Sequence, residues 1–496
     1  MQLIKNVSWN LVTAIWMAVI LVIVTPIYVS ILGFNLYGII GIWLLFQTVM
    51  MFFDFGLGVA LMKEFSIVNI DERKGFYYTD ILRTIEIVYW CISAICVILF
   101  ILTANIFLND WINIKFINIT NISTILVLMF ISLFFQFPSV LYINGLIGLQ
   151  RHKLVSILQM VGNTSKFGIG LLVILYDADL VTFFLIQIFV AIVQTFILRF
   201  FLWKQISEET FDRPLFNFNI IYKVWHFSKH MALTSLLAVS ISNLDRLFVF
   251  KLLPVDDFGR YSLAFTATGL LQLAIQPFYR SFFPLFSELF SKNQLQKLER
   301  MYLLGNQLVS LLIISLAVIC VTFANEIFFV WLGKIDSSTV LVFRFLIVGI
   351  MFSGLGWLPA AFQQAVGWPE LHVKMILLSI VIAIPVLIFS IPALGLLGAS
   401  FVWMIHGIID MTVGLWIMHK SVLKGKLTQF YFEIFTPPFY YALPISLLSF
   451  ELMPQGLNRI NTFIWVSLTS LTIFTLVLLR VRKLIILEKN IKYENF

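Results

Sequence analysis

Charged side chains are scarce in this chain: Asp, Glu, Lys and Arg together make up 12% of its 496 residues. Soluble globular domains carry about a quarter charged residues and are about half apolar, whereas this chain is 60% hydrophobic. The shortage of charge excludes a soluble globular protein and predicts an all-α polytopic membrane protein. The net charge of +8 is therefore interpreted as a topology signal, and nucleic acid is not expected as a partner.

Cysteine is also rare, and its three copies, Cys91, Cys96 and Cys320, all fall in apolar segments. This placement excludes a disulfide framework and a cysteine-based metal site. The chain contains no GxxxxGK[ST] loop, no HExxH and no GxSxG, so neither an ATP-binding protein nor a hydrolase of those types is indicated. We expect a protein without metal or cofactor that is not an enzyme and that draws energy from ion or substrate gradients.

Long apolar runs dominate the rest of the sequence. About 20 apolar residues are needed for a helix to cross a bilayer, and by this measure the chain holds about fourteen such segments. The predicted spans are 9–32, 37–62, 80–104, 122–148, 154–176, 179–202, 229–253, 261–284, 303–325, 338–362, 372–392, 395–418, 432–452 and 460–479. Only very short turns, at 176–179 and 392–395, separate two pairs of spans, so twelve helices stay possible.

Basic residues follow the alternation of these spans. One set of connections carries Lys63, Arg73, Lys74, Arg83, Arg151, Lys153, Lys204, Arg213, Lys223, Lys292, Lys297, Arg300, Lys374, Lys420, Lys424 and Lys426, and the tail after 479 adds five more. The opposite set carries only Lys115, Arg260, Lys334 and Arg459. Because cytoplasmic loops are enriched in Lys and Arg, we expect both termini in the cytoplasm.

The sequence also contains an internal repeat. LGFNLYG (32–38) and LPVDDFG (253–259) share Leu, four residues, an aromatic residue and Gly at an offset of 221, and Pro138 and Pro359 have the same offset. Six spans separate the copies, so the halves have the same orientation and are parallel repeats. The repeat predicts two six-helix lobes around a central cavity, followed by two C-terminal helices. The predicted boundaries are 1–206, 207–420 and 421–496.

Several charged residues fall within the predicted spans, where a charge costs about 2.5–3.5 kcal/mol on the insertion scale. They are the bases Lys166, Arg246 and Arg344 and the groups Asp54, Asp245, His406 and Asp410. In one interpretation acids and bases pair and lock helices together. In the other, the bases line a cavity and bind an anionic substrate, for which a guanidinium offers two parallel hydrogen bonds. His406 and Asp410 share a helix face and suit either a structural hydrogen bond or ion coupling.

Several stretches resemble one family of membrane transporters. These are TPIYVSILGFNLYGIIGIWLLFQTVMMFFDFGLGVAL (25–61), SNLDRLFVFKLLPVDDFGRYSLA (242–264), VWLG (330–333), PAAFQQAVGWPELHVK (359–374) and LGLLGAS (394–400). They resemble the Wzx-type polysaccharide flippases of the multidrug/oligosaccharidyl-lipid/polysaccharide (MOP) exporter superfamily. The resemblance covers nearly the whole chain, but its motifs are patterned apolar runs that do not specify the substrate.

This resemblance implies a function. Such proteins carry undecaprenyl-pyrophosphate-linked oligosaccharide from the inner to the outer leaflet of the bacterial cytoplasmic (inner) membrane, for O-antigen, capsule or exopolysaccharide assembly. It implies ion-driven alternating access, cavity bases that hold the pyrophosphate, and work beside a polysaccharide polymerase and glycosyltransferases. A cation-coupled multidrug exporter of the same superfamily is the first alternative. A membrane-embedded polysaccharide polymerase is the second, although it needs a larger outer loop than 105–121.

Overall fold

The computed structural model describes residues 2–66, 76–103, 122–206, 214–423 and 425–494, and throughout these ranges every regular element is helical. Ten helical stretches in this part of the chain are long and apolar enough to cross a membrane. They are Leu11–Asp54, Tyr78–Leu102, Ile122–Gly148, His152–Tyr176, Leu180–Ile206, Leu295–Thr322, Ser337–Ala365, Pro369–Leu394, Leu396–Ser421 and Arg459–Arg480. The prediction of an all-α, multi-pass membrane protein is confirmed.

The ten stretches relate simply to the predicted spans. Most of the first two predicted spans, 9–32 and 37–62, lies on one continuous stretch, Leu11–Asp54, and the second span ends on the following helix, Leu57–Ser66. The predicted spans 229–253, 261–284 and 432–452 fall on helices that are not among the ten: α10 (Phe218–Leu252), α11 (Val255–Ser291) and α20 (Pro437–Glu451). The chain divides into two compact units, Met1–Ser262 and Leu263–Phe496. The predicted lobe boundary at 206/207 adjoins 207–213, which lies outside the described residues.

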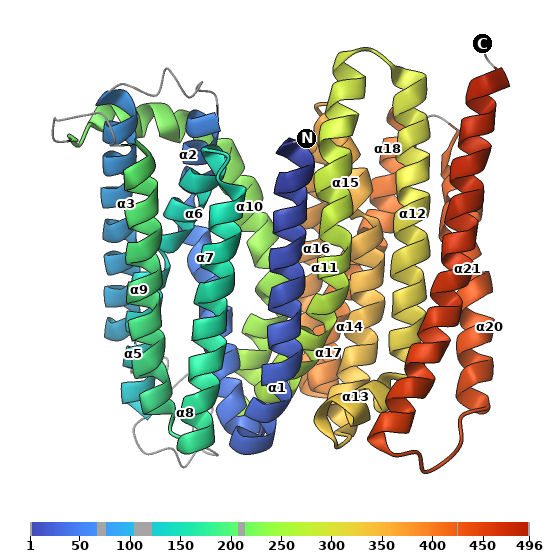
Figure 1. The fold of residues 1–496 in the computed structure, drawn as a ribbon, viewed down its shortest axis with the longest axis horizontal. Coiled ribbons are helices and arrows are strands. Elements are labelled where there is room, and N and C mark those ends of the chain that lie inside the picture. The colour runs from blue at the N-terminus through green and yellow to red at the C-terminus, as the bar shows by residue number, and fades with distance from the viewer. Residues whose placement is uncertain (1, 67–75, 104–121, 207–213, 424, 495–496) are drawn as a thin grey trace. The chain divides into compact units, whose positions relative to one another are not determined.

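The first unit begins with α1 (Gln2–Val49), whose course changes at Gly33 (Figure 1). It continues with η1 (Met50–Asp54), α2 (Leu57–Ser66), α3 (Phe76–Leu102), α5 (Ile122–Gln136), α6 (Ser139–Gly148), α7 (His152–Thr164), η5 (Ser165–Ile169), α8 (Gly170–Tyr176), α9 (Leu180–Ile206), α10 and the start of α11. Gly33 has φ 67° and ψ 178°, a region that is open almost only to glycine. The glycine therefore breaks α1 where the sequence predicted the first turn.

The two copies of the repeated turn motif lie against each other within this unit. A Cβ on Gly38 would lie 2.5 Å from the carbonyl oxygen of Val255, and a Cβ on Gly259 would lie 2.1 Å from that of Phe34. Val255 follows Phe34 by 221 residues, and Gly259 follows Gly38 by the same number. Each copy thus presents the same glycine to the same carbonyl of the other copy, which is the reciprocity of an isologous two-fold contact. Neither position has room for a side chain.

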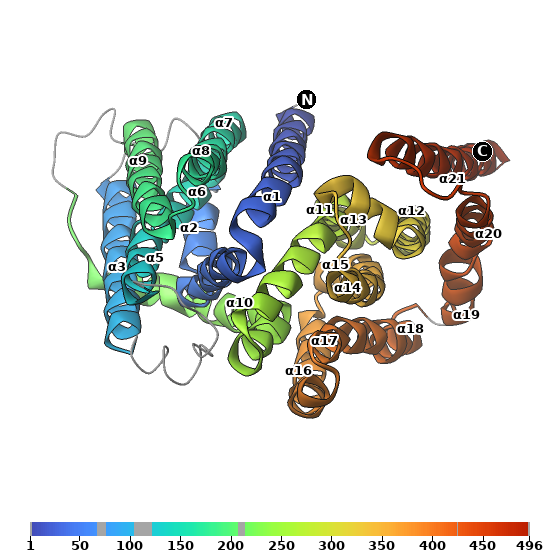
Figure 2. The same cartoon turned by 90° about the horizontal axis from the view of Figure 1, so that it is seen from below.

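The second unit holds the rest of α11 and is also helical. Its elements are α12 (Leu295–Thr322), α13 (Ala324–Leu332), α14 (Ser337–Leu355), α15 (Trp357–Ala365), α16 (Pro369–Leu394), α17 (Leu396–Ile409), η6 (Asp410–Gly414), α18 (Leu415–Ser421), α19 (Leu427–Gln429), η7 (Phe430–Phe435), α20 and α21 (Arg459–Glu494). Figure 2 views these helices nearly end-on, with α17 beside α14 and α16, and α20 beside α12 and α21. The last two helices form a pair at the side of the unit.

Both short turns expected from the sequence are present. Asp177 is extended and ends α8, and Asp179 accepts hydrogen bonds from the backbone N–H groups of Val181 (3.1 Å) and Thr182 (2.9 Å) at the start of α9. Gly395, with φ 58°, separates α16 from α17. Both turns therefore reverse the chain over very few residues.

Candidate functional site

Lys166 lies at a local irregularity of its helix, in the π-helical turn η5 between α7 and α8. Its ammonium donates to Gln47 Oε1 at 3.1 Å and lies 4.3 Å from the ring centroid of Trp43, and the residue is only 6% exposed. Gln187 donates to the Lys166 carbonyl at 2.9 Å and so satisfies a backbone group of the turn. Single π-helical turns are frequent at functional sites. No carboxylate of the described residues lies within ion-pair distance of this ammonium.

Arg246 lies on α10 and contacts Thr48 of α1, the residue that follows Gln47. Its Nη2 donates to Thr48 Oγ1 at 3.3 Å and to the Oδ1 atom of Asn243. Thr48 Oγ1 donates in turn to Asn243 Oδ1 at 2.8 Å. Because Gln47 and Thr48 are consecutive, the two buried bases contact one turn of α1. We call this group of five residues the α1-turn site: Gln47, Thr48, Lys166, Asn243 and Arg246.

The α1-turn site also contains a donor for which the described structure shows no partner. The Nε2 atom of Gln47 is buried and makes no hydrogen bond there. Lys166 and Arg246 were predicted from the sequence, whereas Gln47, Thr48 and Asn243 were not. Their only sequence signal is that they are polar residues within apolar runs. Two cations and an amide donor have the chemistry that suits an anion.

The two acids of this unit that sequence analysis singled out each accept a hydrogen bond from a tyrosine. Asp245 is fully buried and accepts from the Tyr261 hydroxyl at 2.6 Å. Asp54 accepts from the Tyr89 hydroxyl and from the backbone N–H of Gly58 at 3.1 Å, at the start of α2. The second contact makes Asp54 a cap at the start of α2. The structure thus gives both acids a positioning partner.

A third buried acid, Glu86 on α3, was missed by sequence analysis. It is 2% exposed, and its carboxylate contacts Arg199 Nε at 2.6 Å and Arg83 Nη1 at 3.2 Å. The hydroxyl of Tyr142 and the indole N–H of Trp203 donate to the same carboxylate at 2.7 and 3.4 Å. The signal was an acid inside the predicted span 80–104. Since every oxygen has a partner, this cluster holds α3, α6 and α9 together.

The remaining predicted residues lie in the second unit and form two separate groups. Arg344 on α14 is half-buried and donates to the carbonyl oxygen of Val321 at 3.2 Å. His406 Nε2 and Asp410 Oδ2 are 3.6 Å apart, and His406 Nδ1 lies 3.1 Å from Ser379 Oγ. His406 and Asp410 therefore face each other as their four-residue spacing predicted. Asp410 opens a second π-helical turn, η6.

Comparison with known proteins identifies the family. Residues 3–290 match the model of a family described as "Polysaccharide biosynthesis protein". The chain belongs to the polysaccharide biosynthesis protein family. A Shigella flexneri protein named "Putative O-antigen transporter" is 21% identical over 429 residues, which cover 84% of this chain and 98% of that protein.

Solved structures establish the fold of this family member. The lipid II flippase MurJ in an inward closed conformation superposes with a TM-score of 0.69 at 13% identity, covering 97% of this chain and 100% of MurJ. An inward-facing multidrug resistance transporter of the MATE family, within the MOP superfamily, gives a TM-score of 0.59 at 13% identity, covering 85% and 96%. The fold is that of MOP superfamily transporters, and the resemblance stated from the sequence is confirmed.

Proposed function

We propose that this polysaccharide biosynthesis protein flips a polyprenyl-pyrophosphate-linked oligosaccharide from the cytoplasmic to the outer leaflet of the bacterial inner membrane. The proposal draws on the family, on the O-antigen transporter named above, and on the α1-turn site. One observation carries the substrate class: Lys166 is a buried base without a carboxylate partner among the described residues. A buried charge needs a partner, and an anionic headgroup would provide it.

The chemistry of the α1-turn site suits a pyrophosphate. The Lys166 ammonium has three N–H donors, and Gln47 takes one of them. The guanidinium of Arg246 presents a planar fork that can bond two phosphate oxygens at once. The unpartnered Gln47 Nε2 adds a neutral donor. Together these groups would hold the charged end of the substrate, while Arg344 of the second unit is proposed as a further base on its path.

The proposed topology has fourteen helices, two lobes at 1–206 and 207–420, two further helices at 421–496, and both termini in the cytoplasm. Within the first unit, the N-terminal end of α1, the ends of α2 and α9 and the α6–α7 connection lie at one end (Figure 1). These ends carry Lys63, Lys204 and Arg151. Within the second unit, the α11–α12 connection and the end of α18 share one end and carry Lys292 and Lys420. Clustering of bases at one end supports a cytoplasmic assignment for it.

The proposed transport cycle is alternating access driven by an ion gradient. Asp54, Asp245, His406 and Asp410 are the groups proposed to couple it, because they are the acids and the histidine that sequence analysis placed at membrane depth. The protein would receive its substrate from glycosyltransferases and deliver it to a polysaccharide polymerase. It would act as a transporter and not as an enzyme.

The test is a gene deletion followed by analysis of lipid-linked oligosaccharide in the two leaflets. We expect complete single repeat units to accumulate on the polyprenyl carrier in the inner leaflet, and wild-type protein to restore export. Lys166→Gln and Arg246→Gln should each lower export by about tenfold or more, because a hydrogen bond to a charged group contributes about 1.5–3 kcal/mol. Lys297→Gln, at an exposed lysine on α12, is the matched control and should export normally.

Other outcomes would favour the alternatives. Single units that reach the outer surface without being polymerised would indicate a polymerase. Unchanged lipid-linked sugars in the deletion strain would overturn the flippase and favour a multidrug exporter. Normal export by both Lys166→Gln and Arg246→Gln would leave the flippase in place but remove the α1-turn site as its anion site.

A further inference from the structure

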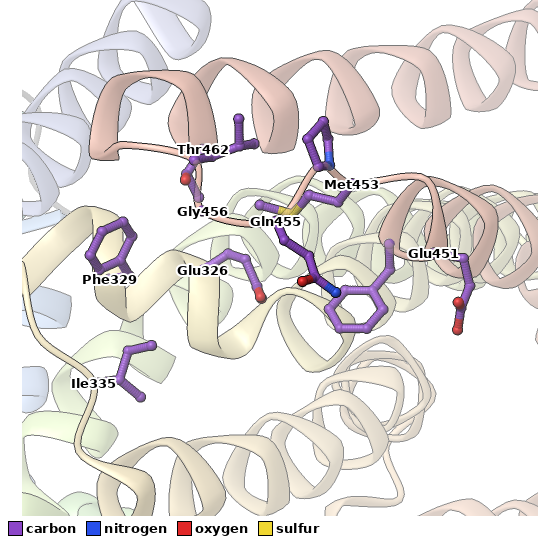
Figure 3. A pocket seen from close by; sticks show the side chains of 11 residues that line it. Glu326, Phe329, Ile335, Glu451, Met453, Gln455, Gly456 and Thr462 are labelled. Carbon is purple, nitrogen blue, oxygen red and sulfur yellow. The ribbon is translucent and has the colours of Figure 1, made fainter.

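The second unit contains a pocket that is separate from every residue discussed so far. It has a volume of about 450 Å³ and lies between α13, the end of α20, the α20–α21 connection and the start of α21. Figure 3 shows Glu326 and Gln455 among the side chains of its interior, with Glu451 further along the wall and Thr462 on α21 (Figure 3). Small-molecule pockets have volumes of about 300–1,000 Å³, so this pocket has the size of a ligand site.

Glu326 gives the pocket its chemical character. It lies in the first turn of α13, where the partial positive charge of a helix N-terminus favours a carboxylate. Its Oε2 atom is buried and makes no hydrogen bond to any residue that the structure describes. Buried polar atoms almost always have a partner. Because this oxygen has almost no exposed surface, a ligand that brings a hydrogen-bond donor into the pocket would satisfy it after a rotation of the Glu326 side chain.

The other walls restrict the class of ligand. The lining residues include no Lys or Arg but a second carboxylate, Glu451, and the amide of Gln455. The base that follows the loop, Arg459, donates instead to the carbonyl oxygens of Val330 at 2.7 Å and Trp331 at 3.4 Å, where it caps the end of α13. Two carboxylates without a lining base disfavour an anion such as pyrophosphate. Carboxylates accept hydrogen bonds and cannot donate them, so the ligand must supply donors.

Two aromatic side chains form apolar walls of the pocket. Phe329 on α13 and Phe450 on α20 line the same pocket as the carboxylates and the amide. A pocket with aromatic walls and a few convergent polar acceptors suits a ligand with apolar faces and many hydroxyl donors at its edge. A sugar ring has both properties, since its C–H faces are apolar and its hydroxyl groups point outward.

The position of the pocket agrees with this ligand. Within the second unit, α13 and the α20–α21 connection lie at the end opposite the α11–α12 connection, which carries Lys292 (Figure 1). Under the proposed topology this is the outer side of the membrane. We propose that the pocket is a saccharide site that receives sugar residues of the carried glycolipid on the outer side. The assignment to the carried glycolipid rests on the proposed function, whereas sugar binding itself can be measured without transport.

The test is saturation-transfer-difference NMR on the purified full chain in detergent, with free glucose, N-acetylglucosamine, mannose and rhamnose as probes. We expect saturation transfer to at least one sugar. Glu326→Gln and Gln455→Ala should each reduce it at least fivefold. Glu288→Gln, at an exposed glutamate near the end of α11, is the matched control and should leave it unchanged. Gln455 lies in an exposed connection, so its variant stays informative if Glu326→Gln folds poorly.

Three results would overturn the saccharide site. The first is the absence of saturation transfer to any sugar in the wild-type protein. The second is saturation transfer in both Glu326→Gln and Gln455→Ala that equals that of the wild type. The third is Ca²⁺ binding that is lost in Glu326→Gln, without any sugar signal. The third result would identify a cation site. If sugars bind but the deletion strain exports normally, the proposed function fails and the pocket stands. If export fails in the deletion strain and no sugar binds, the proposed function stands and the saccharide site fails.

Discussion

At the scale of single residues, the buried charges of this membrane protein differ in how completely they are paired. Glu86 has partners from Arg83, Arg199, Tyr142 and Trp203. Lys166, by contrast, has one amide acceptor and the rings of Trp43 and Phe167. A fully partnered carboxylate stabilises the fold, while an incompletely partnered base is open to a ligand. The number of partners of a buried charge therefore distinguishes a structural from a functional role better than its depth in the membrane does.

The structural role of Glu86 leads to a stability prediction. Replacing Arg199 by Leu removes the closest base of the buried carboxylate. Arg199 is 37% exposed and Arg83 stays at 3.2 Å, so the loss should be smaller than the about 3–5 kcal/mol of a fully buried pair. The double variant Glu86→Leu/Arg199→Leu removes both charges and should therefore be more stable than Arg199→Leu alone. The measurement is the thermal midpoint of the purified proteins in detergent. Equal thermal midpoints for the single and double variants would show that this ion pair does not stabilise the fold.

Only part of the α1-turn site could be predicted from the sequence, for a physical reason. Lys166 and Arg246 are recognisable because a base within an apolar run is visible without knowing the fold. Gln47 lies 119 residues from Lys166, and Thr48 lies 198 residues from Arg246. Which neutral residues meet these bases depends on the packing of α1 against other helices, which no local pattern encodes.

At the scale of helices, glycines and short turns were the predictable features. The turn after residue 32 and the breaks near 176–179 and 392–395 follow from Gly33, from Asp177 and Asp179, and from Gly395. The π-helical turns at 165–169 and 410–414 were not predictable. Such a turn shifts the register of the helix by about one residue, and in a segment that is apolar on all sides this shift leaves no trace in the pattern.

The break in α1 can be tested by a matched pair of glycine variants. An added Cβ meets nothing within 4 Å at either Gly33 or Gly269, and only Gly33 has a positive φ. Gly33→Ala should therefore lose about 1–3 kcal/mol from backbone strain alone. Gly269→Ala, inside α11, should gain about 0.5–1 kcal/mol because alanine favours a helix. Thermal unfolding in detergent measures both. A Gly33→Ala variant as stable as Gly269→Ala would show that the positive φ is not required.

At the scale of the whole molecule, the repeat predicted from the sequence has a physical counterpart in one contact. Gly38 and Gly259 occupy equivalent positions in the repeat and approach each other's backbone reciprocally. Gly41 and Ser262 are also 221 residues apart, and a Cβ on Gly41 would lie 2.9 Å from the Ser262 Cβ. A residue that touches its own repeat equivalent lies close to a two-fold axis. Under the proposed topology this contact lies on the outer side, where an alternating-access transporter must open to release its substrate.

A reversible cross-link at this axis tests whether the contact must open. In a background with Cys91, Cys96 and Cys320 replaced, Gly41→Cys and Ser262→Cys place two thiols at a contact where the Cβ positions are 2.9 Å apart. A disulfide has a Cβ separation of about 3.5–4.5 Å, so the two helices must move apart slightly to form it. Oxidation should trap lipid-linked repeat units in the inner leaflet, and reduction should restore export, because a closed outer side cannot release them. Each single cysteine variant, oxidised in the same way, should export normally. Undiminished export by a fully cross-linked double variant would mean that this contact persists through the cycle and that the substrate leaves by another route.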